Sequence, residues 1–91
     1  MEVNPWYDRN TIIHSAVATR MERILVVDDD PQIREIIRTP IEQAGMVALE
    51  AETGRQAIER LNSDRIDVIV LDLMMDDGDG LEVLRYLRSR Q

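Results

Sequence analysis

Residues 24–31 read Ile-Leu-Val-Val-Asp-Asp-Asp-Pro, an apolar run of four that ends in three aspartates and a proline. A short, largely β-branched run between charged residues is typical of a parallel strand that is buried on both faces. Pro31 suits the first turn of a helix, and Asp30 before it suits the N-cap position. The stretch therefore predicts a strand over 24–27 that leads directly into a helix.

The helix predicted after Pro31 carries its apolar residues at helical spacing on one face: Ile33, Ile36, Ile37, Ile41 and Ala44. Gly45 is expected to end it as the C′ residue. Pro40 conflicts with this pattern, because an interior proline removes a backbone hydrogen bond and kinks a helix. We expect either a bend near Ile36–Ile37 or an early end to the helix.

The alternation of strand and helix occurs twice more. A second, weaker strand is predicted over 47–51, followed by a short helix that opens at Thr53-Gly54, and a third, buried strand over 67–71 ends at Asp72. The inner face of the second helix is marked by Ala57, Ile58 and Leu61, and a loop over 62–65 follows it. A loop over 73–80 leads to the third helix, whose inner face is marked by Leu81, Leu84 and Leu87. The order βαβαβα predicts an α/β fold with a parallel sheet and right-handed crossovers.

The 91-residue chain divides near Met21. Residues 1–20 show no sustained periodicity and are interpreted as an N-terminal arm or leader, with a strand or helix over 11–19 as the alternative. Residues 21–91 contain all three βα units and are expected to form one small domain.

The composition excludes several classes of protein. The net charge of −7 provides no electrostatic footprint for nucleic acid or an anionic membrane. No cysteine is present, which excludes disulfides and thiolate metal sites, and all 11 basic residues are arginine, which excludes lysine chemistry. No apolar run is long enough to span a bilayer, and no signal peptide is expected. These features fit a cytoplasmic protein.

Two of the predicted strands end in aspartates, Asp28 and Asp29 after the first and Asp72 after the third. Ligands of open parallel sheets bind beyond the carboxyl ends of the strands, so these carboxylates would converge if the strands are neighbours. Carboxylates that lie so close together repel one another. Either their pKa values rise so that one is protonated, or a hard cation binds between them, for which Mg²⁺ is the natural choice. A carboxylate beside such a cation can also attack phosphorus. The alternative is that the aspartates serve only as turn and cap residues, which is the interpretation preferred for Asp30.

Residues 24–31 and 67–80 together closely resemble the receiver domain of bacterial two-component response regulators. The resemblance covers about Glu22 to Arg90, and its specificity comes from combining Val-Val-Asp-Asp-Asp with Val-Leu-Asp-Leu-Met-Met. It implies a flavodoxin-like (CheY-like) sheet, here incomplete, with strand order 2-1-3. It also implies a phosphoacceptor signalling domain rather than an enzyme, with autophosphatase activity left open.

The resemblance further implies that Asp72 is the phosphoacceptor in a phosphorelay whose donor is a sensor histidine kinase. Asp29 and Asp72 would bind Mg²⁺ or another divalent cation, with Asp28 helping through water. The main-chain carbonyl of Met74 would be a further ligand of the cation, while the side chains of Met74 and Met75 are expected to pack beside the loop.

The sequence departs from the family pattern in two respects. Where the family usually has a proline four residues after the acceptor, this chain has Asp76 followed by Asp77, which adds negative charge beside the site. Residues 21–91 also match only three of the five βα units, so the domain is interpreted as a partial receiver, truncated after the third unit. The chain contains no counterpart of the family's phosphoryl-binding lysine, so we expect cation binding to survive and phosphorylation to be impaired.

In strand order 2-1-3 the third strand is an edge, and an apolar edge is a template for pairing with another chain. A small core also favours oligomerisation. We therefore expect a homodimer, formed through the third strand or by exchange of the 1–20 arm. The alternative function is a non-catalytic dimerising or interaction module, or a receiver fragment without phosphotransfer activity.

Overall fold

The computed structural model describes residues 21–76 and 78–90. Its elements are β1 (Arg23–Val27), α2 (Pro31–Gln43), β2 (Val47–Ala51), α3 (Gly54–Ser63), β3 (Val68–Leu71) and α4 (Asp79–Ser89). The predicted βαβαβα order is therefore confirmed, while the interpretation of residues 1–20 falls outside the described residues. Among the described helices, none has the length and apolar character that crossing a membrane requires.

The three strands form one parallel sheet in the order β2-β1-β3, which confirms the order 2-1-3. Val27, the last residue of β1, lies beside Ala51 of β2 and Leu71 of β3. All three strands consequently end at the same edge of the sheet, and the residues that follow them are brought together there.

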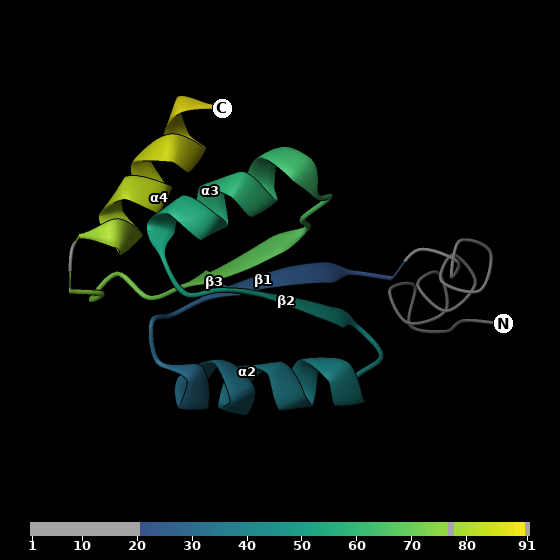
Figure 1. Ribbon diagram of the computed structural model, residues 1–91. Coiled ribbons are helices and arrows are strands. Elements are labelled where there is room, and N and C mark those ends of the chain that lie inside the picture. The colour runs from purple at the N-terminus through teal and green to yellow at the C-terminus, as the bar shows by residue number, and fades with distance from the viewer. Residues whose placement is uncertain (1–20, 77, 91) are drawn as a thin grey trace, which may run out of the picture.

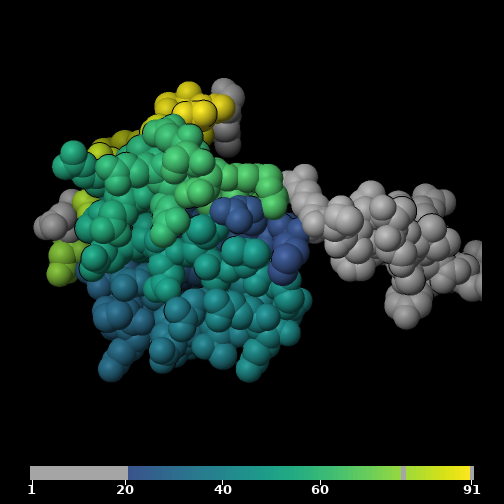
Figure 2. Space-filling model, turned by 45° about the vertical axis from the view of Figure 1, so that its right-hand side comes forward, coloured from purple at the N-terminus to yellow at the C-terminus, as the bar shows by residue number. Residues whose placement is uncertain are grey.

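The helices cover the sheet unequally, with α2 on one face and both α3 and α4 on the other (Figure 1). Leu25 and Val27 of β1 belong to the core under α3 and α4, whereas Ile24 and Val26 pack with Ile41 of α2. In Figure 2 the start of the described chain (dark blue) reaches the surface between the other elements, while Ile24 to Val27 of β1 are buried. The prediction that this strand is buried on both faces is confirmed.

The expectation of a third strand buried on both faces is wrong. Val68 and Val70 remain 48% and 37% exposed, whereas Ile69 and Leu71 pack against the core on the side of α3 and α4. The physical reason is that α2 packs over β1 and β2, so its face of the edge strand β3 stays uncovered in the described part of the chain.

The start of α2 agrees with prediction, since the carboxylate of Asp30 accepts a hydrogen bond from the Gln32 N–H at 2.8 Å. Gly45 follows the helix with a positive φ of 83°, as expected of a C′ glycine. The alternative of an early end at Pro40 is wrong, because α2 continues to Gln43. Pro40 has no N–H group, so it cannot donate the usual helical hydrogen bond to the carbonyl of Ile36. Ile36 is 66% exposed, so water can bond to this carbonyl instead.

The apolar faces of the helices are narrower than predicted. Ile41 is the buried residue of α2, while Ile36 and Ala44 are exposed. In α4 the buried side chain is Val83, and Leu81 is 45% exposed. Two boundaries also differ, because α3 extends to Ser63 and α4 already begins at Asp79, so that Gly80 lies inside its first turn.

Candidate functional site

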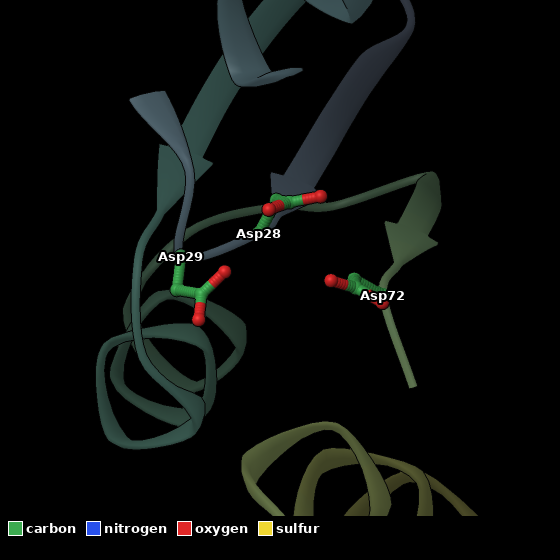
Figure 3. Close-up of side chains that lie close together, drawn as sticks. All are labelled: Asp28, Asp29 and Asp72. Atoms are coloured by element: carbon green, nitrogen blue, oxygen red, sulfur yellow. The ribbon is translucent and has the colours of Figure 1, made fainter. Parts of the chain in front are cut away.

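Three carboxylates meet at the carboxyl edge of the sheet. Asp28 and Asp29 directly follow β1, and Asp72 directly follows β3. One oxygen from each of the three residues lies within 4.8 Å of the others. In Figure 3 the side chains of Asp29 and Asp72 face one another across a space bordered by Asp28. The structure thus brings together the three aspartates singled out in the sequence.

The main chain explains why they converge. The Asp72 N–H donates to the Val27 carbonyl at 3.0 Å, and the Asp28 N–H donates to the Ala51 carbonyl at 3.1 Å. Sheet hydrogen bonding therefore continues one residue beyond the strands. Because neighbouring strands are about 4.8 Å apart, side chains at these positions are held at a distance that one ion can bridge.

Two of the carboxylates are oriented by nearby amides. Asp28 is buried, and its Oδ1 accepts a hydrogen bond from the Asp30 N–H at 2.9 Å. The Oδ1 of Asp72 accepts one from the Met74 N–H at 2.8 Å. Both contacts join a side chain to the amide two residues later, the local geometry that aspartate favours in turns. The side chains are therefore partly preorganised.

The cluster carries unfavourable charge. Partial desolvation raises the pKa of the exposed Asp29 carboxyl above its ordinary 3.8, and the negative charges of Asp76, Asp28 and Asp72 raise it further. Asp76 is the residue that stands where the family has a proline, so this departure does add charge to the site. Asp77 lies outside the described residues. A proton or a cation would relieve the repulsion.

The residues after Asp72 follow the expectations only in part. Met75 is buried in the core, as expected, but the expected packing of the Met74 side chain is wrong, because it is 85% exposed. The amide of Met74 contacts Asp72, whereas the role of its carbonyl as a cation ligand stays a prediction.

The first turn of α4 packs closely against the main chain of Asp72 and Leu73. A Cβ atom added to Gly80 would lie 2.2 Å from the carbonyl oxygen of Asp72 and 2.8 Å from the Cα of Leu73. Next to Gly80, the Asp79 carboxylate accepts a hydrogen bond at 3.0 Å from the N–H of Gly54, which is the first residue of α3. These two contacts attach the loop after β3 to both helices on that face of the sheet.

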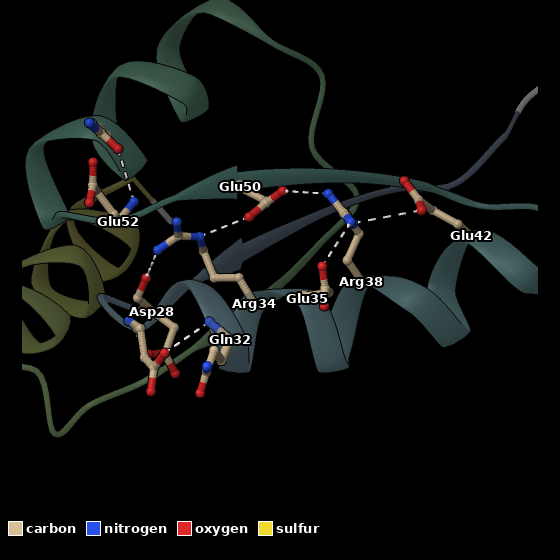
Figure 4. Close-up of polar contacts among 10 residues, drawn as sticks. Asp28, Gln32, Arg34, Glu35, Arg38, Glu42, Glu50 and Glu52 are labelled. Atoms are coloured by element: carbon tan, nitrogen blue, oxygen red, sulfur yellow. Dashed lines mark hydrogen bonds and ion pairs between the residues drawn. The ribbon is translucent and has the colours of Figure 1, made fainter.

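Two residues connected to the site were not predicted from the sequence: Arg34 of α2, which contacts Asp28, and Glu50 of β2, which contacts Arg34. Arg34 donates from Nη1 to the Asp28 carbonyl oxygen at 2.7 Å and from Nε to Oε1 of Glu50 at 2.8 Å (Figure 4). The signal available in the sequence was Glu50 itself, the only charged residue in the strand Val47–Ala51. Hydrogen bonding to Arg34, together with the charge of Arg38, lowers the pKa of the Glu50 carboxyl.

The donor set fits a hard divalent cation. All three side chains offer carboxylate oxygens, the ligands that Mg²⁺ prefers in proteins, and Mg²⁺ is commonly held by one or two carboxylates and several waters. Opposite ligands of Mg²⁺ are about 4 Å apart. Oxygens that lie within 4.8 Å of one another can therefore share such an ion directly or through water.

Comparison with known sequences gives a consistent result. The family model of the response regulator receiver domain matches residues 24–91. The chain is 51% identical over 67 residues to the response regulator MprA of Mycolicibacterium vanbaalenii, and the match covers 74% of this chain and 29% of MprA. It is 41% identical over 69 residues to the KDP operon transcriptional regulatory protein KdpE of Escherichia coli, covering 76% of this chain and 31% of KdpE.

Solved structures agree with the sequence comparison. The response regulator protein TrrA of Thermotoga maritima, in complex with Mg²⁺-BeF, matches with a TM-score of 0.72 and 38% identity over 78% of this chain and 62% of that one. The complex of the histidine kinase ThkA with TrrA matches with a TM-score of 0.71 and 38% identity, over 78% of this chain and 61% of that one. The chain thus spans less than two thirds of these relatives.

Proposed function

Because this chain belongs to the response regulator receiver domain family, we propose that Asp72 accepts a phosphoryl group from a histidine kinase. Asp28, Asp29 and Asp72 would hold the divalent cation, Mg²⁺ in the simplest case, and the carbonyl of Met74 would add a ligand. The observation that carries the proposal is the approach of the three carboxylates to within 4.8 Å at the edge where β1 and β3 end.

Asp72 has the properties that a phosphoacceptor needs. It is partly exposed, and the Met74 N–H holds one of its oxygens, which leaves a carboxylate oxygen to approach phosphorus. The bond between this oxygen and phosphorus forms as the bond from phosphorus to the donor's imidazole nitrogen breaks, and the released imidazole takes up a proton. A bound cation would supply neutralisation of the charge on the phosphoryl oxygens.

The proposed phosphorylation is slow in the 91-residue chain. These 91 residues contain no lysine, so they offer no lysine ammonium to contact the phosphoryl oxygens, and Asp76 adds a negative charge that repels an anionic donor. The cytoplasm is the proposed compartment, on the family relationship alone. The kinase partner is supported by the similarity to TrrA, which has been crystallised with a histidine kinase.

Incubation with acetyl phosphate and Mg²⁺ is expected to add one phosphoryl group to the parent chain and none to Asp72→Asn. Intact-protein mass spectrometry measures the gain, and EDTA should abolish it. Asp30→Asn is a suitable control, because it removes a neighbouring charge while asparagine preserves the helix cap.

Labelling of Asp72→Asn, labelling that EDTA does not affect, or no labelling of a parent chain with a folded circular dichroism spectrum would each contradict the proposal. The last result would favour the non-catalytic interaction module.

A homodimer is proposed as the second role, because β3 is an edge strand of the described sheet and the side chains of Val68 and Val70 are exposed. Residues 68–71 carry no charge, so two copies could pair edge to edge without repulsion between these residues. In such a pairing the valines of one copy would meet those of the other, which would bury apolar area on both.

Sedimentation of the parent chain is expected to show a mass that rises with concentration towards that of a dimer. Val70→Lys should remain a monomer, because a lysine on the edge opposes pairing. Deleting residues 1–20 separates the two modes of assembly: strand pairing predicts a dimer that persists, whereas arm exchange predicts a monomer. A parent chain that remains monomeric at all concentrations would disprove both.

A further inference from the structure

Among the described contacts, the ion-pair network between α2 and β2 reaches the acidic cluster at the carbonyl of Asp28 (Figure 4). Arg34 contacts this carbonyl at 2.7 Å, and Glu50 accepts from the same guanidinium at 2.8 Å. With only 14% of its side chain exposed, Arg34 lies between two elements and has little freedom to move.

The contacted carbonyl belongs to the peptide between Asp28 and Asp29. A peptide unit is planar, so a contact that holds its oxygen restrains the orientation of the plane and the direction in which the chain leaves for Asp29. The other side of Asp28 is held by its N–H bond to Ala51. The two contacts together restrain the main chain from which both adjacent carboxylates project.

We propose that Arg34 is a positioning residue for the divalent-cation site, acting through the Asp28 carbonyl, and that Glu50 holds its guanidinium in place. The inference rests on the proposed cation site and deepens it. The planar guanidinium suits this role, because its N–H groups diverge at fixed angles and can bond two acceptors simultaneously.

Charge and position predict opposite effects of removing Arg34. As a positive charge near the cluster, Arg34 repels a cation, so its loss would strengthen cation binding. As a positioning residue, its loss releases the 28–29 peptide and weakens binding. Loss of a group that orients metal ligands typically costs about 10-fold or more in affinity.

Arg38 provides a matched control. It lies on the same helix and bonds the other oxygen of Glu50 at 3.1 Å, so Arg34→Met and Arg38→Met each remove one positive charge and one bond to Glu50. The described contacts of Arg38 are with Glu35, Glu42 and Glu50, all away from the Asp28 carbonyl.

The test is titration of Mg²⁺ into each protein by calorimetry at pH 7. We expect Arg34→Met to bind about 10-fold more weakly than the parent and Arg38→Met to bind equally well or better. Arg34→Lys should also bind weakly, because one ammonium keeps the charge but not the two-armed contact. In the metal-free proteins, the amide resonance of Asp29 should shift in both Arg34 variants and remain in place in Arg38→Met.

Several outcomes would overturn the inference. Equal affinities of Arg34→Met and Arg38→Met, or full affinity of Arg34→Lys, would show that Arg34 does not act by position. If circular dichroism shows that Arg34→Met does not fold, the Mg²⁺ affinities of Arg34→Lys and Glu50→Gln are compared with that of Arg38→Met instead. Both are expected to be weaker, because each variant loosens the guanidinium contact with the Asp28 carbonyl. A folded parent chain that binds no Mg²⁺ would overturn the cation site as well, which distinguishes failure of the site from failure of the inference alone.

Discussion

Replacing Gly80 with alanine is expected to destabilise the chain by about 3 kcal/mol or more, at the upper end of the cost of overpacking. The added Cβ would lie 2.2 Å from the Asp72 carbonyl oxygen and 2.8 Å from the Leu73 Cα. Both are main-chain atoms, so no side-chain rotation can relieve the overlap, and either α4 or the loop after β3 must move. A domain of this size has only about 5–10 kcal/mol of stability in total.

Helix propensity predicts the opposite sign, which makes the experiment decisive. Glycine to alanine within an α-helix ordinarily stabilises, by up to about 1 kcal/mol at interior positions. Urea unfolding of parent and variant would measure the difference. Gly45→Ala is the control, since its φ of 83° disfavours alanine while no atom lies within 4 Å of the added Cβ; it should cost only about 1 kcal/mol. A Gly80→Ala variant at least as stable as Gly45→Ala would refute the steric account.

Replacing Asp29 with asparagine is expected to raise the stability of the metal-free protein and to weaken Mg²⁺ binding by more than about 10-fold. The second effect follows because a ligand should matter more than the outer groups that orient it. The first follows from the raised pKa of Asp29. The folded state binds this proton more tightly than the unfolded state, so the parent loses stability as the pH rises through the interval between the two pKa values.

The difference between parent and Asp29→Asn should therefore be small at a pH below both pKa values and greatest at neutral pH. Thermal unfolding with and without Mg²⁺ measures both effects. Without the ion the variant should melt above the parent, and with a large excess of the ion the order should reverse, because a ligand present at 100 times its dissociation constant stabilises by about 2.7 kcal/mol. Asp30→Asn, outside the three-carboxylate cluster, should show no such reversal. A variant that melts below the parent in both conditions would contradict the argument.

The features that depend on local chemistry were predictable from the sequence. Four apolar residues ending in Asp28 specify a buried parallel strand, and Asp30 before Pro31 specifies the start of α2. The meeting of Asp28 and Asp72 was predictable too, because it requires only that the strands they follow be neighbours in a parallel sheet. Because each aspartate directly follows its strand, both carboxylates lie at the carboxyl edge of the sheet.

Features that depend on which element packs over a given strand or helix face were not predictable from the sequence. The sequence of an apolar strand is the same whether helices cover one of its faces or both. Val68 and Val70 were therefore expected to be buried like Val26. Likewise, nothing in the helical spacing shows whether a neighbour covers Leu81. The bridge through Arg34 was missed because it depends on a long side chain crossing between elements, which sequence spacing does not encode.

The position of β1 at the centre of the sheet has a consequence for the order in which the molecule assembles. Its pairing with β2 closes a shorter loop of chain than its pairing with β3, so the β1–α2–β2 unit is expected to form first. Asp72 reaches Asp28 and Asp29 only when β3 docks, and the repulsion among the carboxylates therefore opposes that last step. An ion that bridges them would act mainly by slowing the departure of β3, lengthening the lifetime of the folded molecule more than it speeds folding.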